Sequence, residues 1–176
     1  MDQYSMGKLI GVVVGIVVGL IIALVVLKFM NKDKKVRTEY DEMQKQIRNK
    51  GYFYAFYTVL VYEAILAVLS IAVELPVHPI VLHFGAIFVG VVVQASYSIW
   101  KDAYVGLNTN MKRFLIFAVI ISLFNLFIFF MNWKEGEAIA DGILQPAWVN
   151  LFCGLMFAVL GAVAVVKKLA VREVEE

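Results

Sequence analysis

A few polar side chains inside long apolar stretches are the residues of this sequence that could carry chemistry. Glu63 stands alone as an acid in the middle of such a stretch. Because a charge at that depth of a bilayer is costly, we expect Glu63 to face protein and to be protonated. The other intramembrane polar candidates are His83, Gln94, Asn125 and Asn150.

Glu63 and Asn125 occupy equivalent positions in two apolar stretches. Glu63 lies eleven residues after Tyr52, and Asn125 lies eleven residues after Phe114. At about 1.5 Å of helix rise per residue, both side chains lie about 16 Å deep, near the midplane. A protonated Glu63 and the Asn125 amide would satisfy each other's hydrogen bonds. Such a pair suits a bond that joins two helices, and it equally suits a proton- or cation-coupled carrier or channel.

A second pair of polar residues follows two prolines. His83 lies four residues after Pro79, and Asn150 lies four residues after Pro146. This spacing puts the two side chains at one level, near the outer surface. With the matched offsets of the first pair, it predicts that residues 52–166 repeat one hairpin twice, about an axis along the membrane normal.

Motifs typical of enzymes are missing from the sequence. It contains no nucleotide-binding loop, no nucleophile elbow and no H-E-x-x-H helix. The only cysteine, Cys153, lies in an apolar stretch, which excludes an intrachain disulfide and favours a packing role. We expect no enzymatic activity, no cofactor, no metal site and no nucleic-acid partner.

The composition is that of a membrane protein. Of 176 residues, 62% are hydrophobic and 17% are charged, and the mean hydropathy is +0.82. About 20 apolar residues are needed to cross a bilayer core about 30 Å thick, so the sequence predicts an all-α, polytopic fold with five transmembrane helices. The five stretches are Leu9–Met30, Tyr52–Val73, Ile80–Trp100, Phe114–Trp133 and Ala147–Val166.

Basic residues gather on one side of these predicted spans. Fourteen of the sixteen Lys and Arg residues lie around the loop after the first span, around the loop after the third, or after the fifth. The other side has only Lys8 and Lys134. Because basic residues stay on the cytoplasmic side of a membrane, we expect the N-terminus outside and the C-terminus inside.

The first span carries small residues at every fourth position. Gly11, Gly15 and Gly19 form a smooth stripe on one face of the predicted helix, where another helix can come close. The stripe fits either the protein's own helices or a second copy or protein partner. The span exceeds the apolar region of a signal peptide and lacks a basic segment before it, so we interpret it as retained.

The loop between the first two spans has the pattern of an amphipathic helix over residues 36–50. Apolar residues recur at helical spacing at Val36, Tyr40, Met43 and Ile47. We expect a helix that begins at a Thr38–Asp41 capping pair, lies at the cytoplasmic interface and turns into the second span at Gly51. It would rest on lipid or dock a cytosolic partner.

The segment T-E-Y-D-E-M-Q-K-Q-I-R-N-K-G-Y-F-Y-A-F-Y, residues 38–57, resembles a stretch of small integral membrane proteins of Firmicutes-type bacteria. In that family an acidic stretch leads through R-x-K into an aromatic span, and Met43 stands where an arginine is expected. The resemblance implies a multi-pass protein of the bacterial cytoplasmic membrane. It implies no activity and no catalytic residue.

Together these patterns predict four parts: the first helix (1–30), a cytosolic connector (31–51), a four-helix membrane bundle (52–166) and a cytosolic tail (167–176). The expected function is that of a non-enzymatic accessory or regulatory membrane subunit. Its partner would bind through the first helix, residues 36–50 or the tail. The alternative is a small proton- or cation-coupled carrier or channel that uses Glu63.

Overall fold

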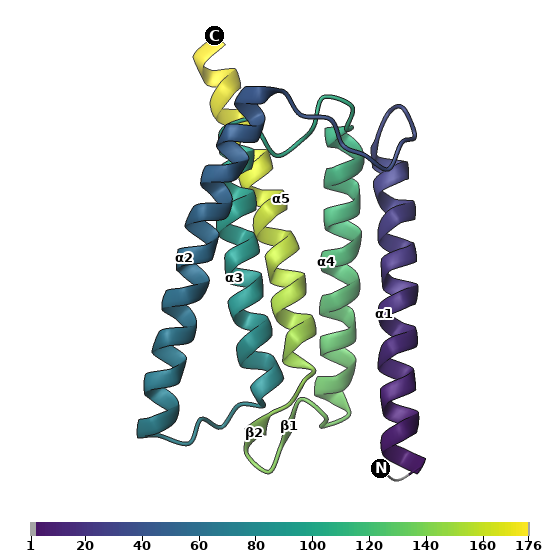
Figure 1. Cartoon of the computed structure of the whole chain (residues 1–176), viewed down its shortest axis with the longest axis vertical. Coiled ribbons are helices and arrows are strands. Elements are labelled where there is room, and N and C mark those ends of the chain that lie inside the picture. Colours follow the sequence, from purple (N-terminus) through teal and green to yellow (C-terminus); the bar gives the residue numbers. More distant parts are fainter. Residues whose placement is uncertain (1–2, 176) are drawn as a thin grey trace.

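Five helices make up most of the chain (Figure 1). The computed structural model describes residues 3–175, with side chains described for residues 6–7 and 9–171. The elements are α1 (Gln3–Met30), α2 (Glu42–Ala72), α3 (Pro79–Trp100), α4 (Met111–Lys134), β1 (Ile139–Ala140), β2 (Ile143–Leu144) and α5 (Trp148–Glu175). Each helix contains a stretch long and apolar enough to cross a membrane. This confirms the all-α prediction with five candidate spans.

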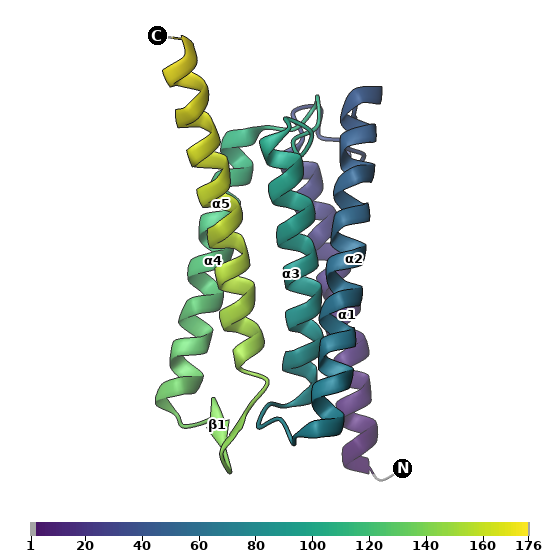
Figure 2. The same cartoon turned by 90° about the vertical axis from the view of Figure 1, so that its left-hand side faces the viewer.

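The last four helices form a bundle of two hairpins. α2 packs on α3, α4 packs on α5, and the hairpins meet where α3 packs on α5. Viewed from the side, α3 lies between α2 and the α4–α5 hairpin (Figure 2). This arrangement has the contact pattern expected of two repeated hairpins, and the repeat itself stays a prediction.

The buried core of the bundle lies where α3, α4 and α5 meet. Its members are Ala95, Ile99, Phe114, Met156, Leu160 and Ala164. Most of the other large apolar side chains point outward and are exposed, as on a helix bundle that is surrounded by lipid. Small side chains in this core let the helices approach closely, as in membrane bundles generally.

α2 is one continuous helix and not a connector followed by a span. Asp41 caps its N-terminus, because the Asp41 side chain accepts a bond of 2.7 Å from the backbone N–H of Gln44, and the Gln44 side chain accepts from the Asp41 N–H. The helix therefore begins at Glu42, and the predicted start near Val36 and the Thr38–Asp41 cap are wrong. Residues 36–41 form an irregular linker instead.

The turn expected at Gly51 is absent. Gly51 lies inside α2 and is buried. A Cβ atom there would lie 3.2 Å from Ser98 Oγ and 3.3 Å from the Gln94 carbonyl oxygen. Glycine at this position therefore lets α2 approach α3, and α2 crosses the level of Gly51 without a break.

A short β-hairpin closes the end of the bundle at which α1 begins. Asp141 and Gly142 have positive φ values of 52° and 76°, as a tight two-residue turn between strands requires. Beside the hairpin, His78 N–H donates to the Leu144 carbonyl, and Leu144 N–H donates to the Pro76 carbonyl. The loop between α2 and α3 is thereby tied to the hairpin between α4 and α5.

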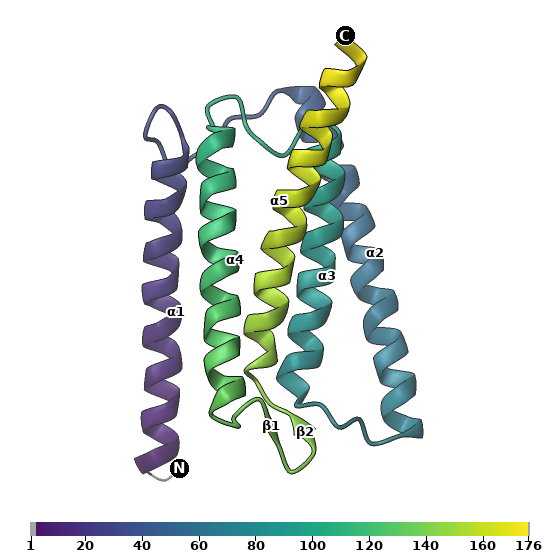
Figure 3. The same cartoon turned by 180° about the vertical axis from the view of Figure 1, so that it is seen from behind.

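α5 continues as a helix through the segment that was predicted to be a tail. It runs to Glu175, and residue 176 lies outside the described residues. Lys167 anchors this extension, because its ammonium group donates to the Ile99 carbonyl at 3.1 Å and pairs with Asp102. The last turns of α5 thus project beyond the bundle (Figures 1 and 3).

Candidate functional site

Glu63 is paired with His83. Glu63 Oε1 lies 3.3 Å from His83 Nδ1, so the contact joins α2 to α3. The pair lies on the outside of the bundle, with side chains that are 37% exposed for Glu63 and 65% for His83. Two groups that the sequence analysis assigned to separate levels are therefore neighbours.

The register of α2 against α3 explains this pairing. Gly90, at the middle of α3, faces Val59, because a Cβ at position 90 would lie 2.7 Å from Val59 Cγ2. Glu63 lies four residues further along α2, or about 6 Å from that level. Glu63 is therefore displaced from the middle of the bundle toward His83.

The expected bond between Glu63 and Asn125 does not form. Asn125 Nδ2 donates to the Ile121 carbonyl of its own helix at 2.9 Å. α2 and α4 belong to different hairpins, which meet through α3 and α5. The acid–amide pair that motivated the carrier hypothesis is thus replaced by an acid–imidazole pair.

The remaining polar candidates are dispersed over the bundle. Gln94 is buried in α3, and its amide donates to Ser98 Oγ at 3.1 Å. Asn150 is half-buried in the first turn of α5, where its backbone N–H donates to the Ala147 carbonyl at 3.0 Å. The Gln94 amide is thus bonded within α3, and Asn150 lies at the start of α5, so the two residues belong to different helices and form no single site with Glu63.

The small-residue stripe of α1 meets no neighbour. A Cβ atom built at Gly11, Gly15 or Gly19 would have no atom of another described helix or loop within 4 Å. No residue of the apolar window of α1 is buried. In this structure the stripe makes no packing contact with the protein's own helices, and Gly19 faces the bundle only across a cleft.

α1 is fastened to the bundle at its C-terminal end. The Arg113 guanidinium donates to the Phe29 carbonyl at 2.7 Å, and Asn110 N–H donates to the Met30 carbonyl at 3.0 Å. These groups lie at the start of α4 and satisfy carbonyls of the last turn of α1, where a cation is favourable. α1 is therefore held firmly at one end, while its apolar length stands free of the core.

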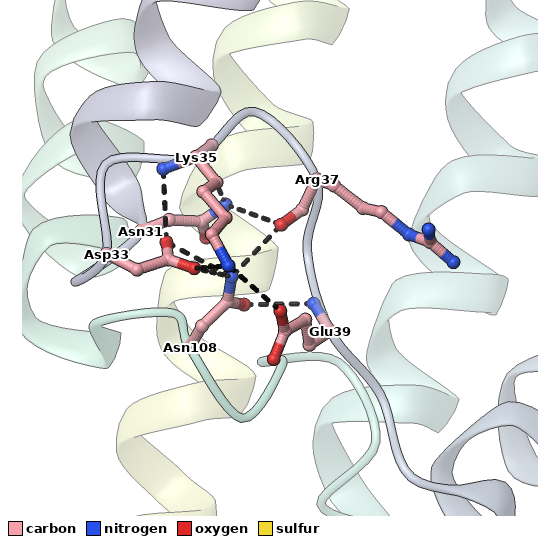
Figure 4. Close-up of polar contacts among 6 residues, drawn as sticks. All are labelled: Asn31, Asp33, Lys35, Arg37, Glu39 and Asn108. Atoms are coloured by element: carbon pink, nitrogen blue, oxygen red, sulfur yellow. Dashed lines mark hydrogen bonds and ion pairs between the residues drawn. The ribbon is translucent and has the colours of Figure 1, made fainter.

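Asn108 holds the linker between α1 and α2 onto the loop between α3 and α4 (Figure 4). Its side-chain oxygen accepts from Glu39 N–H at 2.9 Å, and its side-chain nitrogen donates to the Arg37 carbonyl at 3.0 Å and to the Asp33 carboxylate at 3.2 Å. One amide thus satisfies three points along the linker. The side chain of Arg37 itself points away from the cluster.

Asn31 completes this attachment from the end of α1. It is buried, and its side chain donates to the Lys35 carbonyl at 2.8 Å and accepts from Thr109 Oγ1 at 2.8 Å. Gly106 supplies the space, because a Cβ there would lie 2.6 Å from the Glu39 carbonyl oxygen. The linker is therefore built into the fold and is not a free surface.

The Asp33 carboxylate belongs to this cluster. Bonds from the Lys35 backbone N–H and then from the Asn108 side chain hold the pKa of Asp33 below its usual value. Lys35 Nζ also lies 3.7 Å from both Asp33 and Glu39. The charged form of Asp33 is thus the form that the linker binds.

A cleft of about 600 Å³ opens below the linker, between α1 and the bundle. Its apolar walls come from both sides: Gly19, Ala23, Val26 and Met30 from α1, and Phe114, Phe117 and Phe157 from α4 and α5. Polar residues line the end next to the linker: Asn31, Thr38, Tyr40, Arg48, Tyr52, Tyr104 and Thr109. The cleft is therefore amphipathic along its length.

Arg48 is the cation of this cleft. Its guanidinium lies 4.2 Å from the centre of the Tyr40 ring, donates to Tyr52 Oη at 3.0 Å and lies 3.5 Å from the Tyr104 carbonyl oxygen. Burial raises the pKa of Tyr40 and of Tyr104, so both phenols are neutral. None of the ion pairs formed by described side chains includes Arg48.

Sequence reasoning missed Arg48, Asn31 and Asn108. The i, i+4 spacing of Arg48 and Tyr52 on one helix was a readable signal for the first. The two asparagines gave none, because Asn108 is 69 residues from Glu39 and Asn31 is 78 residues from Thr109, and these partners meet only after the bundle forms.

Metal-ligating side chains are not clustered in the described part of the chain. Within residues 3–175, no group of three or more His, Cys, Asp or Glu side chains is arranged to hold a metal ion. The comparisons add no assignment either, since no protein-family model, no curated protein and no solved structure matches the chain.

Proposed function

We propose that this protein is a non-enzymatic accessory or regulatory membrane subunit, and that α1 is the helix with which it binds a transmembrane helix of its partner. The observation that carries the proposal is the open Gly11–Gly15–Gly19 stripe, which has no neighbour within 4 Å. In lipid, the hydrophobic effect does not drive helices together, because the acyl chains are as apolar as the side chains. Helices associate instead by close packing, and small residues let their backbones approach.

The bundle itself gives α1 this freedom. α3, α4 and α5 have their own core, and Met30 is the residue of α1 that packs against it. The linker after α1 is occupied by contacts with residues 106–109, so α1 is a better candidate for partner binding than the linker part of residues 36–50. α1 contributes little to the core and is attached to the bundle at one end. Such a helix can bind a second membrane protein without disturbing the core.

We further propose that the protein lies in the bacterial cytoplasmic membrane, with its N-terminus outside and its C-terminus inside. The linker, the loop between α3 and α4 and the C-terminal end of α5 lie at one end of the bundle (Figure 1). Fourteen of the sixteen Lys and Arg residues belong to that end. Such a distribution supports the positive end as the cytoplasmic one.

Site-specific photocrosslinking in native membranes tests the partner. A photoreactive amino acid at position 15 lies within the stripe. One at position 17 lies about 200° around the helix and is the matched control. We expect one discrete adduct with another membrane protein from position 15 and none from position 17. Gly15→Ile should abolish that association, because its side chain fills the stripe, whereas Val17→Ile should preserve it.

Two results would overturn the proposal. Equal adduct patterns from positions 15 and 17 would mean that α1 has no preferred face. An adduct that contains only a second copy of this chain would make the stripe an interface of a homo-oligomer and would remove the accessory role.

The Glu63–His83 contact favours a second candidate, a small proton-coupled carrier. An acid beside an imidazole inside a membrane is a pair that can exchange a proton. However, the clefts of about 600 Å³ and 410 Å³ are lined by neither residue. Glu63→Gln distinguishes the two candidates. A carrier would lose pH-driven uptake in reconstituted vesicles, whereas an accessory subunit would retain the crosslink to its partner in native membranes.

A further inference from the structure

The cleft between α1 and the bundle combines one charged group with a long apolar floor. Its lining residues run along α1 from Gly19 to Met30, a length of about 16 Å at the usual helix rise. Its volume of about 600 Å³ falls within the range of sites for small ligands, about 300 to 1,000 Å³. An occupant that matches it has an apolar tail and a polar head.

The charge at the polar end calls for an anion. Arg48 is half-buried, and its described partners are all neutral: a phenol ring, a phenol hydroxyl and a backbone carbonyl. A guanidinium has five N–H donors arranged to bind two oxygens of a phosphate or carboxylate at once. The two donor contacts observed leave most of these donors free.

The position of Arg48 in the bundle points to a lipid headgroup. Arg48 lies three residues before Gly51, close to the end of α3, whereas Phe117 and Phe157 lie deeper on α4 and α5. A molecule with its phosphate at Arg48 would thus have its acyl chain at the depth of the membrane interior. A free phosphate would leave the aromatic part of the cleft unfilled.

We propose that this cleft binds one anionic phospholipid of the surrounding leaflet, with the phosphate at Arg48 and an acyl chain between Ala23 of α1 and Phe117 of α4. The tyrosines that surround Arg48 hold the guanidinium at the cleft mouth. The cleft shares Gly19 with the stripe to which the proposed function assigns a partner helix, whereas Gly11 and Gly15 do not line the cleft and stay open to that partner.

Titration of the delipidated full-length protein, followed by native mass spectrometry, tests the proposal. The probes are phosphatidylglycerol, phosphatidylcholine with the same acyl chains, and water-soluble glycerol phosphate. We expect one molecule of phosphatidylglycerol per chain, bound at least about tenfold more tightly than phosphatidylcholine, because the choline group of phosphatidylcholine brings a second cation close to the Arg48 guanidinium. Glycerol phosphate should bind far more weakly than either lipid.

Two pairs of variants separate the head from the tail. Arg48→Gln should remove the preference for phosphatidylglycerol, whereas Arg37→Gln, which deletes the same charge from an exposed side chain at the same end, should retain it. Ala23→Phe fills the floor and should weaken both lipids about tenfold or more, whereas Val25→Phe, on the exposed side of α1, should not.

Several outcomes would refute the site. Equal affinity of the parent for the two lipids would show that the cleft does not select an anionic headgroup. An equal loss of lipid preference in the Arg48 and Arg37 variants would mean that the preference comes from the overall positive charge of this end and not from Arg48. Tight binding of glycerol phosphate would make it an anion site without a tail, and a lipid-free dimer would make the cleft an interface between copies. Ala23→Phe retains every charge, so it decides the question even if Arg48→Gln does not fold.

Discussion

Glu63 Oε1 lies 3.3 Å from His83 Nδ1 and thereby links the second and third helices on the outer face of the bundle. A protonated acid can donate to the ring nitrogen, and a ring N–H can donate to the carboxylate, so the pair is satisfied in either arrangement. Where lipid replaces water, each group would otherwise lack a partner. The pair therefore stabilises the α2–α3 hairpin.

A double-mutant cycle measures this contact. Glu63→Leu and His83→Phe, alone and together, should show a coupling free energy of unfolding of about 0.6 kcal/mol, the average for hydrogen bonds between membrane helices. Glu63→Leu with Asn125→Leu is the control, and these changes should be additive because the residues do not interact. A coupling between Glu63 and Asn125 that exceeds the one with His83 would contradict the register described here.

Gly154 should be intolerant of a side chain. A Cβ at this position would lie 2.9 Å from Leu126 Cγ and 3.2 Å from the Ser122 carbonyl oxygen, and the backbone cannot move aside cheaply. Gly154→Ala should therefore lower the free energy of unfolding by about 1 to 3 kcal/mol, as overpacking does. Thermal melting in detergent measures the change.

Gly161→Ala is the matched control in the same helix. A Cβ at Gly161 meets nothing within 4 Å, so alanine should stabilise the helix by up to about 1 kcal/mol through its higher helix propensity. If both alanine variants melt alike, the close contact between α4 and α5 is not a source of stability.

The five spans could be predicted from the sequence because hydropathy over about 20 residues depends on no tertiary contact. The partner of Glu63 could not, because depth was counted from Tyr52 on the assumption that a span begins there. α2 instead starts at Glu42, and glycine contacts such as Gly90 on Val59 set its register against α3. Such contacts become visible only when both helices are placed.

For the α1 stripe, too, the sequence predicts a local feature but not its tertiary partner. The spacing of Gly11, Gly15 and Gly19 indicates a face for close packing, and it does not identify a partner.

The predicted and observed starts of α2 show how two nearby caps compete for a helix boundary. The capping box of Asp41 and Gln44 is only one turn away from the predicted Thr38–Asp41 cap. The correct one forms because Asn108 bonds the backbone of Arg37 and Glu39, and Gly106 lets the loop lie against Glu39, so these linker residues do not join the helix.

Asn108→Ala should release the linker. The variant loses the acceptor for Glu39 N–H and the donor to Arg37 and Asp33, which should lower the free energy of unfolding by about 1 to 2 kcal/mol. Hydrogen exchange at residues 36–40 should rise relative to Leu107→Ala, which removes an exposed side chain next to Asn108. Unchanged exchange in Asn108→Ala would show that the remaining contacts hold the linker alone.

Acid should weaken the same attachment. The native fold lowers the pKa of Asp33, so its contribution to stability is present above the ordinary value of about 3.9 and is lost as the pH falls through the lowered value. The parent should melt at a higher temperature than Asp33→Asn at pH 6, and the two should converge below that window. A difference that grows on acidification would reverse the assigned sign.

The orientation of the bundle is open to direct labelling, because its two ends carry exposed residues on well-defined loops. Leu107 is 60% exposed between α3 and α4, and Ile139 is 44% exposed in the β-hairpin at the opposite end. In a Cys153→Ala background, Leu107→Cys and Ile139→Cys each introduce one thiol that breaks no described side-chain hydrogen bond. If the basic end is cytoplasmic, a membrane-impermeant maleimide should label position 139 in intact cells and position 107 only after permeabilisation. Labelling of position 107 in intact cells would invert the proposed topology, and with it the leaflet that supplies the lipid for the Arg48 cleft.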